Sequence, residues 1–423
     1  MRRALIAAVA GAITLGSVAL AVPSQAASVG NPLPVTEFGQ HVPGIAAGVK
    51  PTVPYGTIRL WDSGVAWGQV NQAKGKFWWD GLDHAIGNAN SQKVSSLYVL
   101  GSTPTWAATN KKQGTYPNKG AASMPGMANW KNWVTAVVQR YANSIDSYQI
   151  WNEANLTNFF AGTPAQMADL TAAAYKIIKA GDPTAKVVSA SSTVRLTARY
   201  NKFFPAYLTA LKKKGWPVDA IAIHSYPAAN EGPAERVNYI NKTKSDMAAA
   251  GVPAAIELWD TEVNYGIQGP GSIPAQNIAP ATGAGWVATT YLDNLTLGVA
   301  RSYWYFWAPA DGRVGIVTND GTPAATAYGT TERWLGNAFY SCQRGTNGAA
   351  NTCQMGDNNN PEIVAWVSSG SGKFTVPAGA TVQCDVMNSC SAVAPGTPVT
   401  IGSSPLWFGS QARAAVNQQG LGF

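Results

Sequence analysis

Charged residues and histidines are scarce in this chain of 423 residues. Only 12% of the residues are charged and 46% are hydrophobic, so the chain can bury one large core and a second small one, and it is not disordered. The three histidines, His41, His84 and His224, lack the spacing of metal ligands. We therefore expect no metal and no cofactor.

Long apolar runs are absent after residue 27. Before that point, Arg2 and Arg3 precede an apolar run of small residues, Ala4–Val22, and Ser24–Ala26 offers a small-x-small cleavage site. This pattern predicts a secretion signal peptide over residues 1–27 and an extracellular protein without a membrane anchor. The paired arginines leave the general and the twin-arginine export routes both open.

Cysteine is absent from most of the chain, and all four cysteines come late: Cys342, Cys353, Cys384 and Cys390. An even number within one small region of an exported chain predicts disulfides. Four cysteines allow three connectivities, and proximity in sequence favours Cys342–Cys353 and Cys384–Cys390. Zinc binding is the alternative, but the spacings do not suit it and no histidine lies nearby.

Positive residues outnumber negative ones, with 30 Lys and Arg against 22 Asp and Glu. They are scattered along the sequence, and only Lys212–Lys214 forms a run, at an expected helix end where cations are favoured. We therefore expect no nucleic-acid partner. The charge is compatible with a neutral or mildly acidic polymer as substrate. We expect a monomer.

Apolar, β-branched and aromatic runs alternate with helical patterns, which is typical of a parallel sheet. Eight such units predict a closed (β/α)8 TIM barrel over residues 28–335. An open doubly wound sheet would need a Gly-rich phosphate turn after its first strand, and none is present. The strands are expected at Thr36–Phe38, Thr57–Trp61, Ser95–Leu100, Ser147–Trp151, Lys186–Ala190, Ala220–His224, Ala255–Asp260 and Arg301–Phe306. The clearest helices are expected at Trp130–Tyr141, Pro164–Ala180, Lys202–Lys214, Ala234–Ala250 and Gly285–Leu297.

The sequence changes character after about residue 336. Short strand-like pieces broken by Gly, Asn, Ser and Pro predict a small antiparallel β-domain, sandwich-like, at residues 336–410. We expect this domain to support the barrel, with carbohydrate binding as the alternative. Residues 411–423, rich in Gln, Ala and Gly, are expected to form a loosely ordered tail.

Two apolar runs end abruptly in a carboxylate. Tyr148–Asn155 contains Glu153, and Leu258–Gly266 contains Glu262. Barrel strands deliver functional groups to the open end of the barrel in this way. Retaining glycoside hydrolysis needs such a pair, with one carboxylic acid that protonates the leaving oxygen and one carboxylate about 5–5.5 Å away that attacks the anomeric carbon. Solvated loop carboxylates are the alternative interpretation.

The motifs Trp151-Asn152-Glu153 and Thr261-Glu262 resemble the signature of the superfamily of retaining (β/α)8 glycoside hydrolases, clan A. The wider pattern, Arg59–Asp62 with Phe160–Pro164, is similar to family 39 and related bacterial secreted endoglycosidases. This resemblance implies hydrolysis of a poly- or oligosaccharide by double displacement through a covalent glycosyl-enzyme, with Glu153 as acid/base and Glu262 as nucleophile.

The resemblance also implies binding roles around this pair. Asn152 would hydrogen-bond the sugar 2-hydroxyl, and Arg59 would hold Glu262 ionised. His224 and Tyr226 would line the pocket, with Tyr226 orienting Glu262. We expect Arg59 to lower the pKa of Glu262, and burial with a second negative charge to raise the pKa of Glu153.

Aromatic residues and one more histidine complete the expected pocket. The resemblance places Trp307 under the sugar at the cleavage point. Trp106, in the loop after the third strand, and His41, after the first, are further substrate-binding candidates, with ordinary loop roles as the alternative. Asp260 shares strand parity with Glu262 and is expected to pair with Arg59. A non-catalytic carbohydrate-binding barrel and a transglycosylase with the same intermediate remain as alternative functions.

Overall fold

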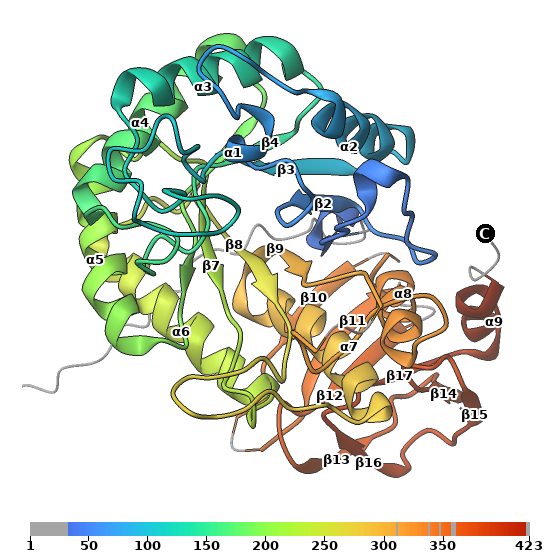
Figure 1. Cartoon of the computed structure of the whole chain (residues 1–423). Coiled ribbons are helices and arrows are strands. Elements are labelled where there is room, and N and C mark those ends of the chain that lie inside the picture. Colours follow the sequence, from blue (N-terminus) through green and yellow to red (C-terminus); the bar gives the residue numbers. More distant parts are fainter. Residues whose placement is uncertain (1–32, 310–311, 337–338, 347, 357–360, 420–423) are drawn as a thin grey trace, which may run out of the picture.

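The computed structural model describes residues 33–309, 312–336, 339–346, 348–356 and 361–419 (Figure 1). The expected signal peptide, residues 1–27, lies outside the described residues.

A closed parallel sheet forms the centre of the molecule. Its hydrogen-bonded order is β5-β4-β3-β2-β1-β9-β8-β7, and the pairing of Val188 with Ala220 joins β5 to β7 and closes the ring. A short strand, β6 (Ser192–Thr193), pairs with the end of β7. The eight main strands are β1 (Phe38–Gln40), β2 (Thr57–Leu60), β3 (Ser95–Val99), β4 (Ser147–Gln149), β5 (Lys186–Val188), β7 (Ala220–His224), β8 (Glu257–Val263) and β9 (Val299–Trp304). The predicted TIM barrel is confirmed.

Helices surround the sheet on its outer side (Figure 1). Four of them begin with proline, whose fixed φ suits the first helical turn, and Thr163 and Thr322 cap two of these by accepting from backbone N–H groups. No helix in the described ranges has the length and hydropathy of a membrane span. The helices are η1 (Val35–Glu37), η2 (Ile45–Ala47), α1 (Trp67–Val70), α2 (Asp80–Ser91), α3 (Met127–Tyr141), α4 (Pro164–Gly181), α5 (Thr197–Lys213), α6 (Pro233–Ala250), α7 (Pro280–Leu297) and α8 (Pro323–Leu335).

The first strand begins later than its sequence predicts. Thr36 and Glu37, expected to be extended, lie in the 3-10 turn η1, and β1 starts at Phe38. A Cβ at Gly39 would lie 2.6 Å from the carbonyl oxygen of Ser302 and 2.7 Å from the ring of Tyr303, so only glycine lets β1 approach β9 this closely. This register places His41 directly after the strand, where its N–H donates to the Trp304 carbonyl.

A bulge interrupts the pairing of β7 with β8. Ile223 pairs with Asp260, but the next residue, His224, pairs with Glu262, so Thr261 is the extra residue. A bulge breaks the alternation of side-chain directions along a strand. Asp260 and Glu262 therefore point to different environments although they are two residues apart.

Asp260 lies in a buried polar network between the sheet and the helices. Its Oδ2 accepts from Arg236 Nη2 at 2.8 Å and from the Ser225 hydroxyl, and Arg236 Nη2 also donates to Asn294 Oδ1 at 2.7 Å. The expected pairing of Asp260 with Arg59 is wrong because the bulge turns Asp260 outward, toward α6 and α7.

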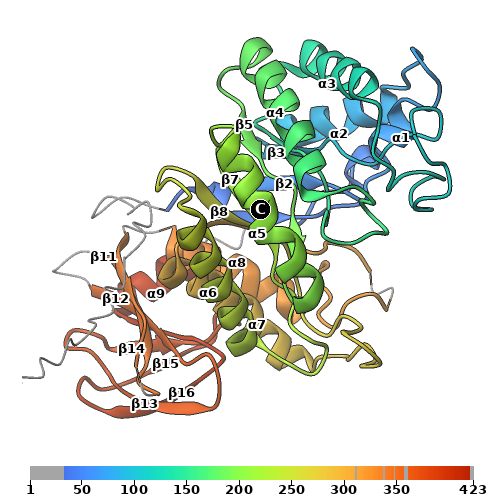
Figure 2. The same ribbon diagram turned by 90° about the vertical axis from the view of Figure 1, so that its left-hand side faces the viewer.

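The C-terminal residues form a small antiparallel β-domain beside α7 and α8, as Figures 1 and 2 show. A six-stranded sheet in the order β10-β11-β12-β17-β14-β15 is accompanied by the pair β13-β16. The disulfides are Cys342–Cys353 and Cys384–Cys390, as proximity predicted. The strands are β10 (Phe339–Gln343), β11 (Asn351–Gly356), β12 (Pro361–Trp366), β13 (Ser371–Thr375), β14 (Val382–Cys384), β15 (Cys390–Ala392), β16 (Pro398–Gly402) and β17 (Leu406–Gly409).

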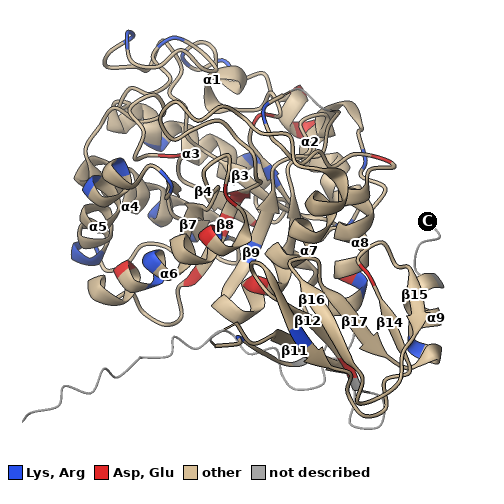
Figure 3. Ribbon diagram, turned by 90° about the horizontal axis from the view of Figure 1, so that it is seen from below, with Lys and Arg blue, Asp and Glu red and all other residues tan. Residues whose placement is uncertain are grey.

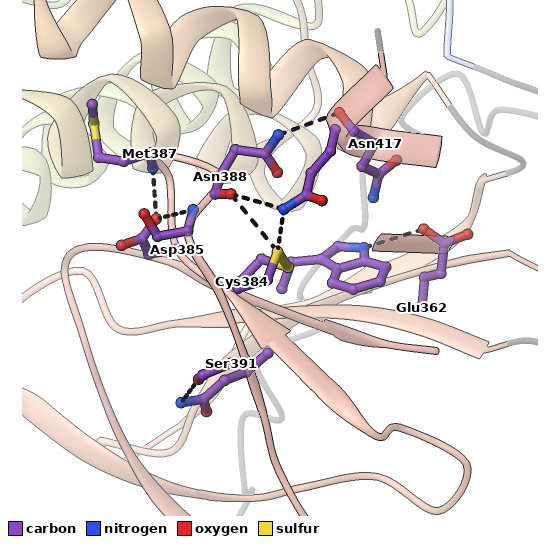
Figure 4. The surroundings of a disulfide bond; sticks show 12 residues. Glu362, Cys384, Asp385, Met387, Asn388, Ser391 and Asn417 are labelled. Atoms are coloured by element: carbon purple, nitrogen blue, oxygen red, sulfur yellow. Dashed lines mark hydrogen bonds between the residues drawn. A yellow bond between two sulfur atoms is a disulfide. The ribbon is translucent and has the colours of Figure 1, made fainter. Parts of the chain in front are cut away.

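The expected loose tail contains a helix, α9 (Gln411–Gln419), which follows β17 directly. Its Arg413 donates to Glu362 at 2.6 Å, and Glu362 also accepts from the Trp407 indole. Figure 4 shows Asn388, close to the second disulfide, donating to the Asn417 carbonyl. Two separate contacts therefore hold this segment against the small domain.

Buried polar contacts connect the small domain to the barrel. Asp293 of α7 accepts from the Trp366 indole at 3.0 Å and from Arg344 at 3.2 Å. The buried carboxylate thus receives donors from two strands of the small domain or their ends, which fixes that domain on α7.

We predict that Arg236→Met lowers the free energy of unfolding by about 3–5 kcal/mol, because it leaves the buried Asp260 carboxylate without its charged partner. Unfolding in urea measures this change. Lys242→Met is the control: it removes a partly exposed i,i+4 ion pair to Asp246 on α6 and the contact of Lys242 with the Tyr200 ring, and it should cost about 0.2–1 kcal/mol. Equal stability of the two variants would contradict the prediction.

Candidate active site

Two carboxylates face each other at the open end of the barrel. Glu153 follows β4, and Glu262 lies near the end of β8. One oxygen of each, together with a ring nitrogen of His224, lies within 4.8 Å of the others. Glu153 has φ of 41°, in the left-handed region, and its N–H donates to the Ser191 hydroxyl at 2.8 Å. Such backbone strain is found where the surrounding structure fixes a functional residue.

Arg59, at the end of β2, is fully buried and holds three side chains at once. Its Nη1 donates to Glu262 Oε1 at 2.6 Å, its Nε to Gln149 Oε1 at 2.6 Å, and its Nη2 to Asn152 Oδ1 at 2.8 Å. Gln149 in turn donates to the Thr261 hydroxyl at 3.2 Å. Because its amide oxygen accepts from Arg59, Asn152 offers its NH2 group to a ligand.

His224 and Tyr226 come from β7 and the residues that follow it. The Tyr226 hydroxyl donates to Glu262 Oε2 at 2.9 Å. His224 Nδ1 lies 3.0 Å from Glu153 Oε1 and 3.3 Å from Glu262 Oε2. Burial lowers the pKa of His224 to about 4, so the ring is neutral at pH 7 and its single proton can bridge the two carboxylates.

The surroundings separate the two carboxylates electrostatically. Burial raises the pKa of Glu153 to about 7; the charge of Asp62 adds to this, while Arg195 and Arg59 oppose it. Glu262 receives donors from Arg59 and Tyr226, and hydrogen bonds to the charged form favour that form. The arrangement therefore suits a protonated Glu153 beside an ionised Glu262.

One electrostatic expectation needs correction. Burial is the largest influence on Glu262 and raises its pKa above the ordinary value, whereas Arg59 and His224 act in the opposite direction. Arg59 therefore offsets the cost of burying this carboxylate without bringing its pKa below normal. The second negative charge that raises the pKa of Glu153 is that of Asp62.

The structure brings His41 to the floor of the site. Its Nε2 lies 3.0 Å from the Thr261 carbonyl, and burial holds its pKa well below the usual range. The ring of Tyr305 contacts His41 edge-on at 5.0 Å between centroids, and lies 6.3 Å from the ring of Tyr226. Tyr305 is thus an aromatic residue of the site that sequence reasoning missed.

Asp62 is a second missed residue. It has φ of 61°, accepts from the Tyr305 hydroxyl at 2.5 Å and from the Tyr116 hydroxyl at 2.6 Å, and lies 3.7 Å from Arg313. Its position in the motif Arg59–Asp62, three residues after the arginine, was the available signal.

The side chains of the two tryptophans proposed from sequence take no part in this contact network. Trp307 is 2% exposed and packs in the core, with its backbone N–H donating to the His41 carbonyl at 2.7 Å. Trp106 is half-buried, and its indole donates to the Asn71 carbonyl at 2.7 Å. Their roles as sugar platforms remain predictions.

Glu153, His224 and Glu262 are, within the described residues, the one cluster whose ligand atoms are close enough for a metal ion. Arg59, at 2.6 Å from Glu262, already places a positive charge in this cluster. These residues therefore suit proton transfer and nucleophilic attack without a bound cation.

Comparisons with known proteins agree with this geometry. The model of glycosyl hydrolase family 10 matches residues 62–284, just over half of the chain. A search of curated protein sequences gives no match.

Solved structures with a similar fold include a family 39 glycoside hydrolase from Bacteroides cellulosilyticus WH2, with 17% identity, a TM-score of 0.67, and coverage of 90% of this chain and 81% of that one. A GH39 β-xylosidase from Caulobacter crescentus has 18% identity, a TM-score of 0.61, and coverage of 90% and 97%. A GH30 endoxylanase from Clostridium papyrosolvens C71 has 14% identity, a TM-score of 0.55, and coverage of 91% and 98%.

We predict that the Glu153 carboxyl titrates at about pH 7, because burial disfavours its charged form. The pH dependence of side-chain carboxyl signals in 13C NMR measures this, and Glu153→Gln assigns the signal by its loss. Asp62→Asn should lower the pKa of Glu153, since it removes a nearby negative charge. Titration of Glu153 at its ordinary value in the unmodified protein would refute the prediction.

Proposed function

The chain belongs to glycosyl hydrolase family 10 and is a glycoside hydrolase, and from this premise we propose that it is a secreted enzyme that cleaves a poly- or oligosaccharide with retention of configuration. The superfamily of (β/α)8 glycoside hydrolases predicted from the two glutamate motifs is confirmed, and the structures of family 39 proteins share the fold. The catalytic roles of individual residues are part of the proposal.

The separation of the two carboxylates carries the proposal of retention. Retaining enzymes hold the two groups about 5–5.5 Å apart, whereas inverting enzymes need about 6.5–9.5 Å to admit a water molecule between carboxylate and sugar. An oxygen of Glu153 lies within 4.8 Å of an oxygen of Glu262. This spacing favours direct attack on the sugar by one carboxylate.

In the first step, Glu262 attacks the anomeric carbon while Glu153 gives its proton to the leaving oxygen. The covalent glycosyl-enzyme forms as the glycosidic bond breaks. In the second step, Glu153, now ionised, takes a proton from water, whose oxygen attacks the anomeric carbon and releases Glu262. The pKa of about 7 suits Glu153 to both the acid and the base role.

Neighbouring side chains support these steps. Arg59 and Tyr226 hold Glu262 charged and aimed before attack. Asn152 presents its NH2 group to the hydroxyl beside the reacting carbon, because Arg59 occupies its oxygen. The N–H at His224 Nδ1 can donate a hydrogen bond to whichever of the two glutamates is ionised.

The cellular setting and first substrates also belong to the proposal. Two disulfides in the small domain suit an oxidising extracellular environment, in agreement with the expected signal at residues 1–27. We propose a monomer. Activity should be tested on a panel of substrates. Because similar folds belong to a β-xylosidase and an endoxylanase, the panel begins with aryl β-xylosides and xylan and continues with other aryl β-glycosides and plant, fungal and bacterial wall polysaccharides.

We predict that Glu262→Ala lowers kcat by several orders of magnitude on every substrate that the wild type cleaves, because it removes the nucleophile. Azide should restore turnover by entering the vacated space, and the product should be a glycosyl azide of inverted configuration. NMR of the product identifies that configuration. Unchanged activity of Glu262→Ala would overturn the assignment.

Glu153→Ala should behave differently, because it removes the proton donor and leaves the nucleophile. We expect a loss of about 10²- to 10⁴-fold on substrates with poor leaving groups. Aryl glycosides with very acidic phenols need little protonation, so their first step should be almost unaffected, with a burst of phenol in rapid-mixing kinetics. An equal loss on both kinds of substrate would contradict an acid/base role.

A further inference from the structure

Two aromatic rings are strongly exposed in the described parts of the chain, and both lie at the open end of the barrel. Trp78 is 49% exposed in the loop between β2 and α2, and Tyr116 is 52% exposed in the loop between β3 and α3. The other large hydrophobic side chains exposed to this degree are aliphatic. Tyr and Trp are enriched at binding interfaces because each combines an apolar ring with a polar group, so these two rings are suitable platforms for the apolar faces of sugars.

Exposed lysines lie on the same two loops. Residues 101–126 contain no acidic residue, and residues 61–79 contain only Asp62. In Figure 3, blue gathers on the loops beside α1, at the top of the picture. The exposed lysines of the two loops are Lys74, Lys76, Lys111, Lys112 and Lys119.

The two loops are joined side by side. Asn71 connects them, since its carbonyl accepts from the Trp106 indole at 2.7 Å and its amide donates to the Lys76 carbonyl at 2.7 Å. Gly68 leaves room for Asn118, because a Cβ at this position would overlap the Asn118 amide oxygen. Lysines distant in sequence therefore share one surface, which we call the lysine rim, residues 71–78 and 105–119.

The lysine rim reaches the catalytic glutamates through Tyr116. Its hydroxyl donates to Asp62 Oδ1 at 2.6 Å, and its ring contacts that of Trp61, with 6.4 Å between centroids. The charge of Asp62 acts on both Glu153 and Glu262. A chain bound at the cleavage point could therefore continue onto the rim.

We propose that the lysine rim binds an anionic polysaccharide next to the cleavage site. Trp78 and Tyr116 stack on sugar faces, and the five lysines pair with the carboxylate or sulfate groups of the polymer. This inference rests on the proposed glycosidase function and names the class of its substrate. A small neutral glycoside would not extend onto the rim.

Affinity electrophoresis tests the proposal in the Glu262→Ala background, in which the polymer in the gel is not consumed. The polymers are glucuronoxylan, the same material after reduction of its carboxyl groups, and dextran sulfate. We expect retardation by at least one acidic polymer and much less by reduced glucuronoxylan. The contrast between glucuronoxylan and dextran sulfate tells carboxylate from sulfate. NaCl should weaken retardation, because at 0.1 M charges are screened beyond about 10 Å.

Removing the positive charges of the lysine rim should remove the preference for acidic over reduced polymers. A variant with all five rim lysines changed to Gln should lose about tenfold or more in apparent affinity for the acidic polymer. The control for surface charge removes three positive charges: it changes Lys212, Lys213 and Lys214, exposed at the opposite end of the barrel, to Gln. Trp78→Ala should weaken binding to acidic and reduced polymers alike, because stacking does not depend on the carboxyl group.

Three outcomes would overturn the proposal. The first is equal retardation by glucuronoxylan and its reduced form together with no retardation by dextran sulfate. The others are unchanged affinity of the rim variant for the acidic polymer, and an equal loss of that affinity in the Lys212–Lys214 control. Failure of the proposed function looks different. An enzyme that cleaves no member of the substrate panel would contradict that function, whereas electrophoretic binding does not depend on catalysis.

Discussion

The buried ion pair between Arg59 and Glu262 is the interaction on which the rest of the site depends. A guanidinium without solvent contact is costly unless each of its donors finds a partner. Here Glu262, Gln149 and Asn152 accept from it, and they come from two other strands or the residues that follow them. The arginine therefore fixes the relative positions of β2, β4 and β8 at the open end of the barrel.

This arrangement also gives two chemically identical side chains different tasks. Glu262 faces a cation and a tyrosine hydroxyl, whereas Glu153 lies in a buried position beside the negative charge of Asp62. A neutral His224 between them can donate a hydrogen bond to either carboxylate. It can therefore stabilise the negative charge on Glu262 or on Glu153 as the reaction proceeds. The preorganised donors need little rearrangement when charge moves.

The surroundings of the pair connect catalysis to substrate choice. Asp62 accepts hydrogen bonds from Tyr305, which lines the floor, and from Tyr116, which belongs to the exposed rim. A single carboxylate thus joins the inner pocket to the outer surface. The small β-domain lies apart from these residues and is fixed to α7 through Asp293, which suits the supporting role expected for it.

The sequence by itself determined the barrel and the two glutamates at the ends of its strands, and it favoured the observed disulfide pairing without fixing it. The meeting of these glutamates with Arg59, Asn152 and Tyr226 was implied by the resemblance to a family. The barrel, the position of the two glutamates and the favoured disulfide pairing follow from local patterns: apolar runs that alternate with helical patterns, carboxylates at strand ends, and cysteines close in sequence. The family resemblance placed Trp307 under the sugar, which remains a prediction, and the ring in contact with His41 and Tyr226 belongs to Tyr305.

Only the tertiary structure decided the remaining features. The bulge at Thr261 directs Asp260 to Arg236, and the close approach of β1 to β9 requires the glycine at position 39. Five lysines that are scattered in the sequence gather on one rim because Asn71 joins two loops. Bulges, close backbone approaches and loop contacts depend on residues far apart in the chain, so no local pattern encodes them.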